Sequence, residues 1–183
     1  MKGRALKGVI PGGTSAKILT AAECDVAMDF DSLAAKGTML GSGGVIVMDE
    51  TTDMVDALYN ILRFYHHESC GQCTPCREGT GWLEKIVGRI RAGQGRMEDL
   101  DLCLEICDMM VGKTICVLAD AAAFPCESII KKYRKEFEDR IRSGKGLVHH
   151  APTGGPLVQL GALSAHNQPG YEAGRAGRVA THG

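Results

Sequence analysis

Three thiols lie within the segment Cys70-Gly71-Gln72-Cys73-Thr74-Pro75-Cys76, at C-x2-C-x2-C spacing. Gly71 and Pro75 favour a tight loop in which each turn returns the next sulfur to the same side. Three cysteines from one loop and a fourth from elsewhere form a common ligand set for a [4Fe–4S] cluster. A structural zinc site more often takes two ligands from each of two C-x2-C pairs. We therefore interpret the segment as three of the four ligands of a [4Fe–4S] cluster.

The fourth ligand must come from the remaining cysteines, which are Cys24, Cys103, Cys107, Cys116 and Cys126. Cys116 ends the segment Gly112-Lys113-Thr114-Ile115-Cys116, which lies in an expected break between two helices and can bend toward a partner loop. Cys103 and Cys107 are spaced i, i+4 on an apolar helical face, where buried inert thiols usually lie. We expect Cys116 to be the fourth ligand, with Cys126, at an expected helix start, as the second candidate.

A cluster held by four thiolates is anionic, and neighbouring positive charge would stabilise it. Arg77 follows Cys76, and Lys113 precedes Cys116 by three residues, so both can offset that charge; ordinary surface ion pairs are the alternative. Helix N-termini expected after Cys76 and after Pro125 would add positive dipole ends. A fully ligated cluster has no open coordination position, so we expect one-electron transfer and no substrate chemistry.

Apolar residues on both sides of the cysteine segment follow a helical period. The pattern predicts a helix at about 53–67 and three more between about 76 and 143, which would pack as a four-helix arrangement. The first of these three places Trp82, Ile86 and Ile90 on one apolar face. His66 and His67 end the helix at 53–67, and we interpret them as C-terminal caps rather than as ligands.

Residues 1–52 have a different pattern, with short apolar runs bounded by glycine and proline. The runs 6–10 and 43–49 predict two strands, and Asp31 or Ser32 could cap a short helix between them. The glycines at 41–44 precede a strand instead of following one, so they indicate a turn rather than a dinucleotide-binding loop. The expected fold class is α+β.

The composition excludes several classes of protein. The chain has 183 residues, of which 44% are hydrophobic and 23% charged, with a net charge of −1. These values are typical of globular proteins, and they give no sign of the basic surface of a nucleic-acid-binding protein. We expect no membrane-spanning helix, no secretory signal, and reduced cysteines in the cytoplasm. The glycine-rich segment 146–183 is predicted to be a disordered tail.

The chain from about Leu6 to Ile141 closely resembles the C-terminal part of the flavin- and NADH-binding subunit of respiratory complex I, the NADH:quinone oxidoreductase. The same motifs occur in the diaphorase subunits of NAD-reducing hydrogenases and NAD-dependent formate dehydrogenases. The matching segments are Val9–Ser15, Met28–Leu33, Met39–Thr52, Glu68–Gly81 and Gly112–Cys116.

The resemblance implies a truncated β-grasp domain in residues 1–52 and a four-helix cluster-binding domain in residues 53–145. It implies a [4Fe–4S] cluster on Cys70, Cys73, Cys76 and Cys116. The cluster would take single electrons from reduced FMN and pass them to neighbouring iron–sulfur subunits, on the way to quinone. Those partners would be the thioredoxin-like [2Fe–2S] subunit and the large iron–sulfur subunit, in a complex peripheral to the inner membrane.

The FMN- and NADH-binding domain of this family has no match in the present sequence. We therefore expect that this chain alone neither binds FMN nor oxidises NADH, and that its sheet lacks strands and has unpaired edges. Three alternatives stay open: a fragment of a diaphorase subunit, a zinc-stapled interaction module, and a remnant without metal.

Overall fold

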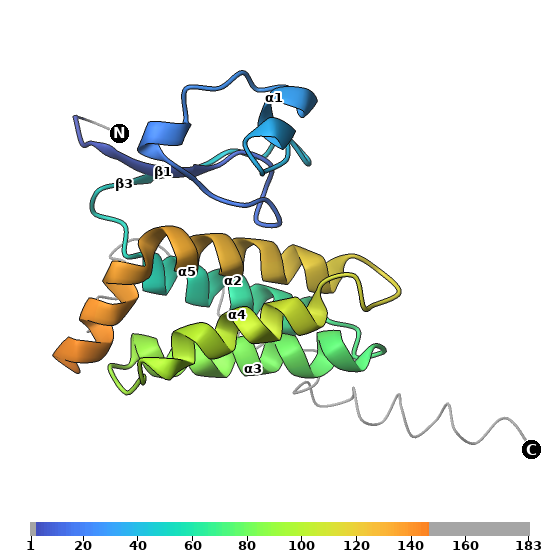
Figure 1. Ribbon diagram of the computed structural model, residues 1–183, viewed down its shortest axis with the longest axis vertical. Helices are drawn as coiled ribbons and strands as arrows, with labels where there is room; N and C mark the ends of the chain where they lie inside the picture. The colour runs from blue at the N-terminus through green and yellow to red at the C-terminus, as the bar shows by residue number, and fades with distance from the viewer. Residues whose placement is uncertain (1–2, 147–183) are drawn as a thin grey trace, which may run out of the picture. The chain divides into compact units, whose positions relative to one another are not determined.

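The computed structural model describes residues 3–146, and it has a strand-rich first part and a helical second part (Figure 1). The elements are β1 (Leu6–Ile10), β2 (Leu19–Thr20), the 3-10 helix η1 (Ala21–Glu23), α1 (Phe30–Ala35), β3 (Ile46–Asp49), α2 (Met54–Glu68), α3 (Thr74–Arg91), α4 (Glu98–Met110) and α5 (Leu118–Ser143). The fold class is therefore α+β, as predicted. Within residues 3–146, none of the helices has the length and hydropathy needed to cross a bilayer. The predicted tail lies, except for Gly146, outside the described residues.

The sheet is small and antiparallel, with the strand order β2-β1-β3. The predicted strands at 6–10 and 43–49 are both present, but β3 begins only at Ile46 because the glycines before it form a turn. In that turn Gly43 N–H donates to the Leu40 carbonyl at 2.8 Å and Gly13 N–H donates to the Gly44 carbonyl at 2.7 Å. This agrees with the prediction of a turn. Among the described residues, β3 pairs only with β1 and is an edge strand.

Helices α2 to α5 pack against one another around a common apolar core. The helix predicted at about 53–67 is α2, and its apolar residues Leu58 and Leu62 are fully buried. Burying a leucine side chain contributes roughly 1.5–3 kcal/mol, so this face supplies much of the stability of the helical part. Trp82 does not belong to the core, since it is 49% exposed. The buried stripe of α3 runs through Leu83 instead, which lies about 100° around the helix from Trp82.

Helix α5 begins earlier than the sequence predicts. The pattern places a helix start at Pro125, but α5 begins at Leu118 and continues through this proline. Ala122 and Ala123 are buried in the core, so packing holds the segment before the proline in a helix despite the lost backbone hydrogen bond. The helix is kinked at Tyr133, where the backbone angles, φ −117° and ψ 22°, are not helical.

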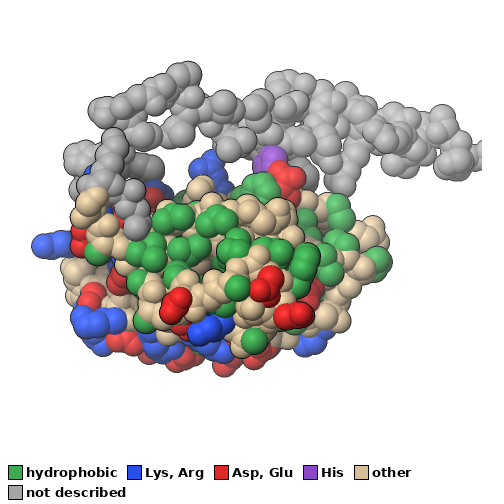
Figure 2. All heavy atoms as spheres, turned by 90° about the horizontal axis from the view of Figure 1, so that it is seen from above, with side chains coloured by type: hydrophobic (Ala, Val, Ile, Leu, Met, Phe, Trp, Pro, Cys, Tyr) green, Lys and Arg blue, Asp and Glu red, His purple; other side chains and the backbone are tan. Residues whose placement is uncertain are grey.

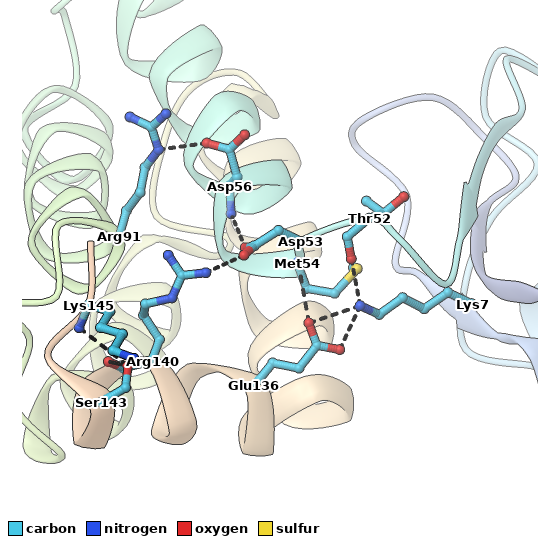
Figure 3. A network of polar contacts seen from close by, with 10 residues as sticks. All are labelled: Lys7, Thr52, Asp53, Met54, Asp56, Arg91, Glu136, Arg140, Ser143 and Lys145. Atoms are coloured by element: carbon cyan, nitrogen blue, oxygen red, sulfur yellow. Dashed lines mark hydrogen bonds and ion pairs between the residues drawn. The ribbon is translucent and has the colours of Figure 1, made fainter. Parts of the chain in front are cut away.

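The same helix attaches the sheet to the helical part, and it lies on the sheet side of the other helices in Figure 1. Tyr133 Oη donates to the Lys7 carbonyl at 2.8 Å, and Lys7 Nζ forms an ion pair with Glu136 at 2.7 Å. Figure 3 shows this pair together with an ion pair between Arg140 and Asp53, the N-cap of α2. These contacts fix α5, β1 and the start of α2 relative to one another.

The strand-rich part has an exposed apolar surface, visible as the hydrophobic side chains that gather on the face seen in Figure 2. Its exposed large apolar residues are Met28, Phe30, Val45 and Val47. Exposed apolar surface of this kind is typical of a contact with another protein.

A pH-dependent contact joins η1 to α5. Lys132 Nζ donates to Glu23 at 2.6 Å, and the Thr20 N–H donates to the same carboxylate at 2.8 Å. The Lys132 hydrogen bond, followed by that of Thr20, lowers the pKa of Glu23 from 4.5 to about 2. A lowered pKa stabilises the fold above pH 4.5, and that stabilisation is lost as the pH falls through 2.

We therefore expect Glu23→Gln to lower the urea midpoint of the chain near pH 6, with the difference from the wild type shrinking between pH 5 and 2. The effect should stay below about 1 kcal/mol, because this carboxylate is partly exposed and solvent screens it. Parallel urea titrations of both chains at several pH values measure it. A difference that stays constant over this range would contradict the assignment.

Candidate metal centre

The predicted three-cysteine loop lies between α2 and α3 and continues into the first turn of α3. Cys73 is the N-cap of α3, and Pro75 occupies the start of the helix, where its missing N–H costs nothing. The helix thus begins at Thr74, before Cys76 rather than after it as the sequence suggests. Cys70 is exposed, while Cys76 is buried with 6% of its surface accessible. The loop can turn this tightly because Gly71 has a φ of +77°.

The second loop connects α4 and α5, in the helix break that the sequence predicts. Gly112, with a φ of +69°, leads out of α4, and its N–H donates to Asp120 of α5 at 2.9 Å. Cys116 is exposed and lies two residues before the first residue of α5. Thr114 Oγ1 donates to the Cys116 carbonyl at 2.7 Å, which holds the local turn.

The two loops meet at the thiols. The Ile115 N–H of the second loop donates to Cys73 Sγ of the first at 3.5 Å. Burial raises the pKa of the Cys76 thiol; the hydrogen bond with Ser69 opposes this, and the charges of Cys116, Cys70 and Cys73 raise the pKa further. Cys70, Cys73 and Cys116 therefore each lie within electrostatic reach of Cys76. No three His, Cys, Asp or Glu side chains within residues 3–146 come together as a site for a single metal ion.

Two helices begin close in sequence to the predicted ligands. Helix α3 begins at Thr74, directly after Cys73, and α5 begins at Leu118, two residues after Cys116. The partial positive charge at a helix N-terminus favours an anionic group near it. The sequence predicts the second N-terminus after Pro125, and the earlier start of α5 brings it to Cys116 instead.

Arg77 and Lys113, which the sequence suggests as partners for the negative charge of a cluster, form hydrogen bonds that stabilise the two loops. Arg77 Nη1 donates to the Gly71 carbonyl at 3.1 Å, and its Nε pairs with Glu78 at 2.8 Å. Lys113 Nζ donates to the Asp108 carbonyl at 3.1 Å. Arg77 thus braces the first loop, in addition to adding positive charge near it.

Sequence reasoning missed Ser69, the residue before the first cysteine. Ser69 is the C-cap of α2, and its Oγ lies 3.2 Å from Cys76 Sγ. The Gly71 N–H donates to the same Oγ at 3.3 Å. The sequence signal that could have indicated this contact is the position of Ser69, a residue with a hydroxyl, directly before the candidate ligand Cys70. The C-cap of α2 is Ser69, while His66 pairs with Glu84 of α3 at 2.5 Å and His67 pairs with Glu68 at 3.1 Å.

The other cysteines lie elsewhere. Cys103 and Cys107 of α4 are buried, as predicted, and their side chains interact with that of Cys126 of α5 in the core. The interactions with Cys103 and Cys107, and then burial, raise the pKa of Cys126 well above its ordinary value. Cys24 donates to the Thr20 carbonyl at 3.2 Å. The second candidate ligand, Cys126, thus belongs to a core thiol group and not to the group formed by the two loops.

The donor set fits an iron–sulfur cluster. Four thiols from two loops match the four-cysteine ligation of a [4Fe–4S] centre, in which each sulfur binds a different iron. The two helix ends suit the negative charge of such a centre. The fit rests on the thiol donors, on the Cys73–Ile115 contact and on the helix N-termini.

Comparison with known proteins gives an independent result. Residues 56–140 match the family model described as the NADH-ubiquinone oxidoreductase-F iron–sulfur binding region. The NADH-quinone oxidoreductase F subunit of Rickettsia akari (strain Hartford) is 49% identical over 138 residues, 75% of this chain and 33% of that protein. The F subunit of Rickettsia bellii (strain OSU 85-389) is 50% identical over 138 residues, which are again 75% of this chain and 33% of that protein. The chain spans about a third of the length of these curated relatives.

Solved structures agree with this result. The NAD+-reducing [NiFe]-hydrogenase in the H2-reduced state aligns with a TM-score of 0.67 and 27% identity, over 80% of this chain and 24% of that chain. The air-oxidized state of the NAD+-reducing [NiFe]-hydrogenase gives the same TM-score of 0.67 with 26% identity, over 91% of this chain and 28% of that chain. All four predicted ligands fall inside the matched residues 56–140.

Proposed function

We propose that this chain relays single electrons through one [4Fe–4S] cluster, because residues 56–140 match the model of the iron–sulfur binding region of the NADH-ubiquinone oxidoreductase F subunit. The proposed ligands are Cys70, Cys73, Cys76 and Cys116. The observation that carries the assignment is the contact between the Ile115 N–H and Cys73 Sγ, because it brings the loop of Cys116 to the three-cysteine loop.

When bound, the cluster supplies one-electron redox chemistry. The chain's own residues hold it in place and tune its surroundings. Cys70, Cys73, Cys76 and Cys116 would hold the cluster through four thiolates, which would leave no open position for a substrate. Arg77 and Gly71 fix the shape of the first loop, and the N-termini of α3 and α5 favour the extra negative charge. Cys70 and Cys116 are exposed, so another protein can approach the site.

The electron donor and acceptor follow from the relatives. We propose reduced FMN, bound by another part of the enzyme, as the donor, and neighbouring iron–sulfur subunits on the route to quinone as acceptors. These subunits would be the thioredoxin-like [2Fe–2S] subunit and the large iron–sulfur subunit, in a cytoplasmic arm peripheral to the inner membrane. The exposed apolar side chains of the strand-rich part support contacts with other subunits (Figure 2). The similarity to NAD+-reducing hydrogenase supports a diaphorase subunit as the alternative.

In this proposal the two parts of the chain have separate roles. Residues 1–52 form a part of a β-grasp domain, and residues 53–145 form the four-helix cluster-binding domain. The packing of α2 to α5 around one core supports the second assignment.

The test is a metal and sulfide analysis of the full chain after anaerobic purification or reconstitution. We expect about four iron and four sulfide per chain, a brown colour, and an EPR signal that appears only on reduction. Stoichiometric zinc without sulfide would contradict the proposal and favour a zinc-stapled interaction module. A colourless chain that cannot be reconstituted would contradict both functions.

A further inference from the structure

We propose that Ser69 sets the reduction potential of the cluster, by donating a hydrogen bond to the sulfur of Cys76. This inference rests on the proposed function, because it requires Cys76 to be a cluster ligand. Ser69 acts in it as a positioning residue that makes no contact with iron.

The geometry fixes the direction of this hydrogen bond. Ser69 Oγ lies 3.2 Å from Cys76 Sγ. A cysteine that binds iron is a thiolate and carries no proton, so the proton between the two atoms must belong to the serine. The Gly71 N–H donates to the same Oγ at 3.3 Å and occupies one of its lone pairs. The hydroxyl proton is therefore directed toward the sulfur.

Burial makes this one contact important. Cys76 is the buried member of the four proposed ligands, with 6% of its surface accessible, whereas Cys70 and Cys116 are exposed. Water can donate to an exposed thiolate, but it has little access to the sulfur of Cys76. The Ser69 hydroxyl thus supplies a hydrogen bond that the solvent would not replace.

The hydroxyl is also held in place before any cluster binds. As the C-cap of α2, Ser69 donates its own N–H to the Tyr65 carbonyl at 3.1 Å. Arg77 also braces the loop, through a hydrogen bond to the Gly71 carbonyl. A preorganised donor needs little rearrangement when the cluster gains an electron.

A hydrogen bond to a ligand sulfur withdraws negative charge and stabilises the reduced cluster more than the oxidised one. Ser69→Ala should therefore lower the reduction potential. We expect a change of up to about tenfold in the reduction equilibrium, which corresponds to about 59 mV for one electron. Ser69→Thr keeps the hydroxyl and should stay near the wild type.

The chain offers a matched control in Thr80. Its Oγ1 donates to the carbonyl of the same cysteine, Cys76, at 2.8 Å, and not to the sulfur. Thr80→Val has nearly the same shape, so it removes a hydroxyl near the loop without removing a sulfur hydrogen bond. Its potential should equal that of the wild type.

The experiment is a potentiometric titration of the four reconstituted chains, followed by EPR, with resonance Raman spectra of the iron–cysteine stretching bands. A lower potential and altered bands in Ser69→Ala alone would support the inference. An unchanged potential in a fully loaded Ser69→Ala chain would overturn it, as would an equal fall in Ser69→Thr or Thr80→Val. If Ser69→Ala does not hold a cluster, Ser69→Thr and Ser69→Val are compared instead, because the two side chains have nearly the same shape and only threonine has a hydroxyl. A lower potential in Ser69→Val than in Ser69→Thr would support the inference, and equal potentials would overturn it.

The two proposals fail differently. A wild-type chain without iron and sulfide would contradict the proposed function. A loaded wild type whose potential does not depend on the Ser69 hydroxyl would contradict only this inference.

Discussion

Cys116→Ser is expected to leave the chain without its cluster. Cys116 is the only thiol of the loop between α4 and α5, so its loss leaves one iron without a protein thiolate. Loss of a residue that merely supports a ligand typically lowers metal affinity by about 10–100-fold, and loss of a ligand should exceed that. Iron and sulfide per chain, measured after anaerobic reconstitution, should fall to the background of the method.

Cys126→Ser is the matched control for this experiment. Cys126 lies with Cys103 and Cys107 in the core, so its substitution should leave iron and sulfide unchanged. Cys126→Ser places a hydroxyl in the core, which can disturb folding. Cys126→Ala adds no hydroxyl, so it shows whether any loss of iron and sulfide in Cys126→Ser comes from a misfolded core. A chain that loses its cluster with Cys126→Ser but keeps it with Cys116→Ser would show that the ligand assignment is wrong.

The largest expected effect on stability comes from the ion pair between α3 and α4. The Asp99 side chain is 1% exposed and accepts two hydrogen bonds from Arg89, at 3.1 Å and 2.5 Å. Arg89→Met would leave this buried carboxylate without its bidentate partner. Breaking one side of a buried pair typically costs about 3–5 kcal/mol, and the partial exposure of Arg89 places the expected loss near the lower end. The free energy of unfolding from urea titration measures it.

Arg96→Met controls for a general loss of positive charge at this site. The Arg96 guanidinium is exposed and lies 3.8 Å from Asp99, so its removal should cost less than about 1 kcal/mol. The Arg96 N–H, which donates to Asp99 at 2.8 Å, stays in this variant. The double variant Arg89→Met, Asp99→Ala should recover part of the loss, because no buried charge remains unpaired. A similar loss in Arg89→Met and Arg96→Met would contradict the argument.

Local patterns in the sequence are sufficient to predict much of this fold. The helical period predicts 53–67, and α2 spans Met54–Glu68; the apolar run 6–10 coincides with β1. These elements depend on side chains close together in the chain, so their pattern is visible without tertiary information. The four candidate ligands were also accessible, because the C-x2-C-x2-C spacing and the helix break at 111–117 are local features.

Elements whose stability comes from distant contacts could not be predicted. Strand β2 has only two residues, and it exists because Val9 of β1 pairs with Leu19. Helix α5 passes through Pro125 because buried packing outweighs the backbone hydrogen bond that proline removes.

The sequence alone therefore identified the four candidate ligands and most of the helices, since thiol spacing and helical period are properties of neighbours in the chain. Only the tertiary structure decided which of them meet: the Ile115 N–H reaches Cys73 across 42 positions, and Ser69 reaches Cys76 from the end of another helix. The tertiary structure also shows that Cys126 lies in the core and that α5 begins at Leu118, near Cys116, and not at Pro125. Such contacts depend on how the helices pack together, and no short stretch of sequence encodes that packing.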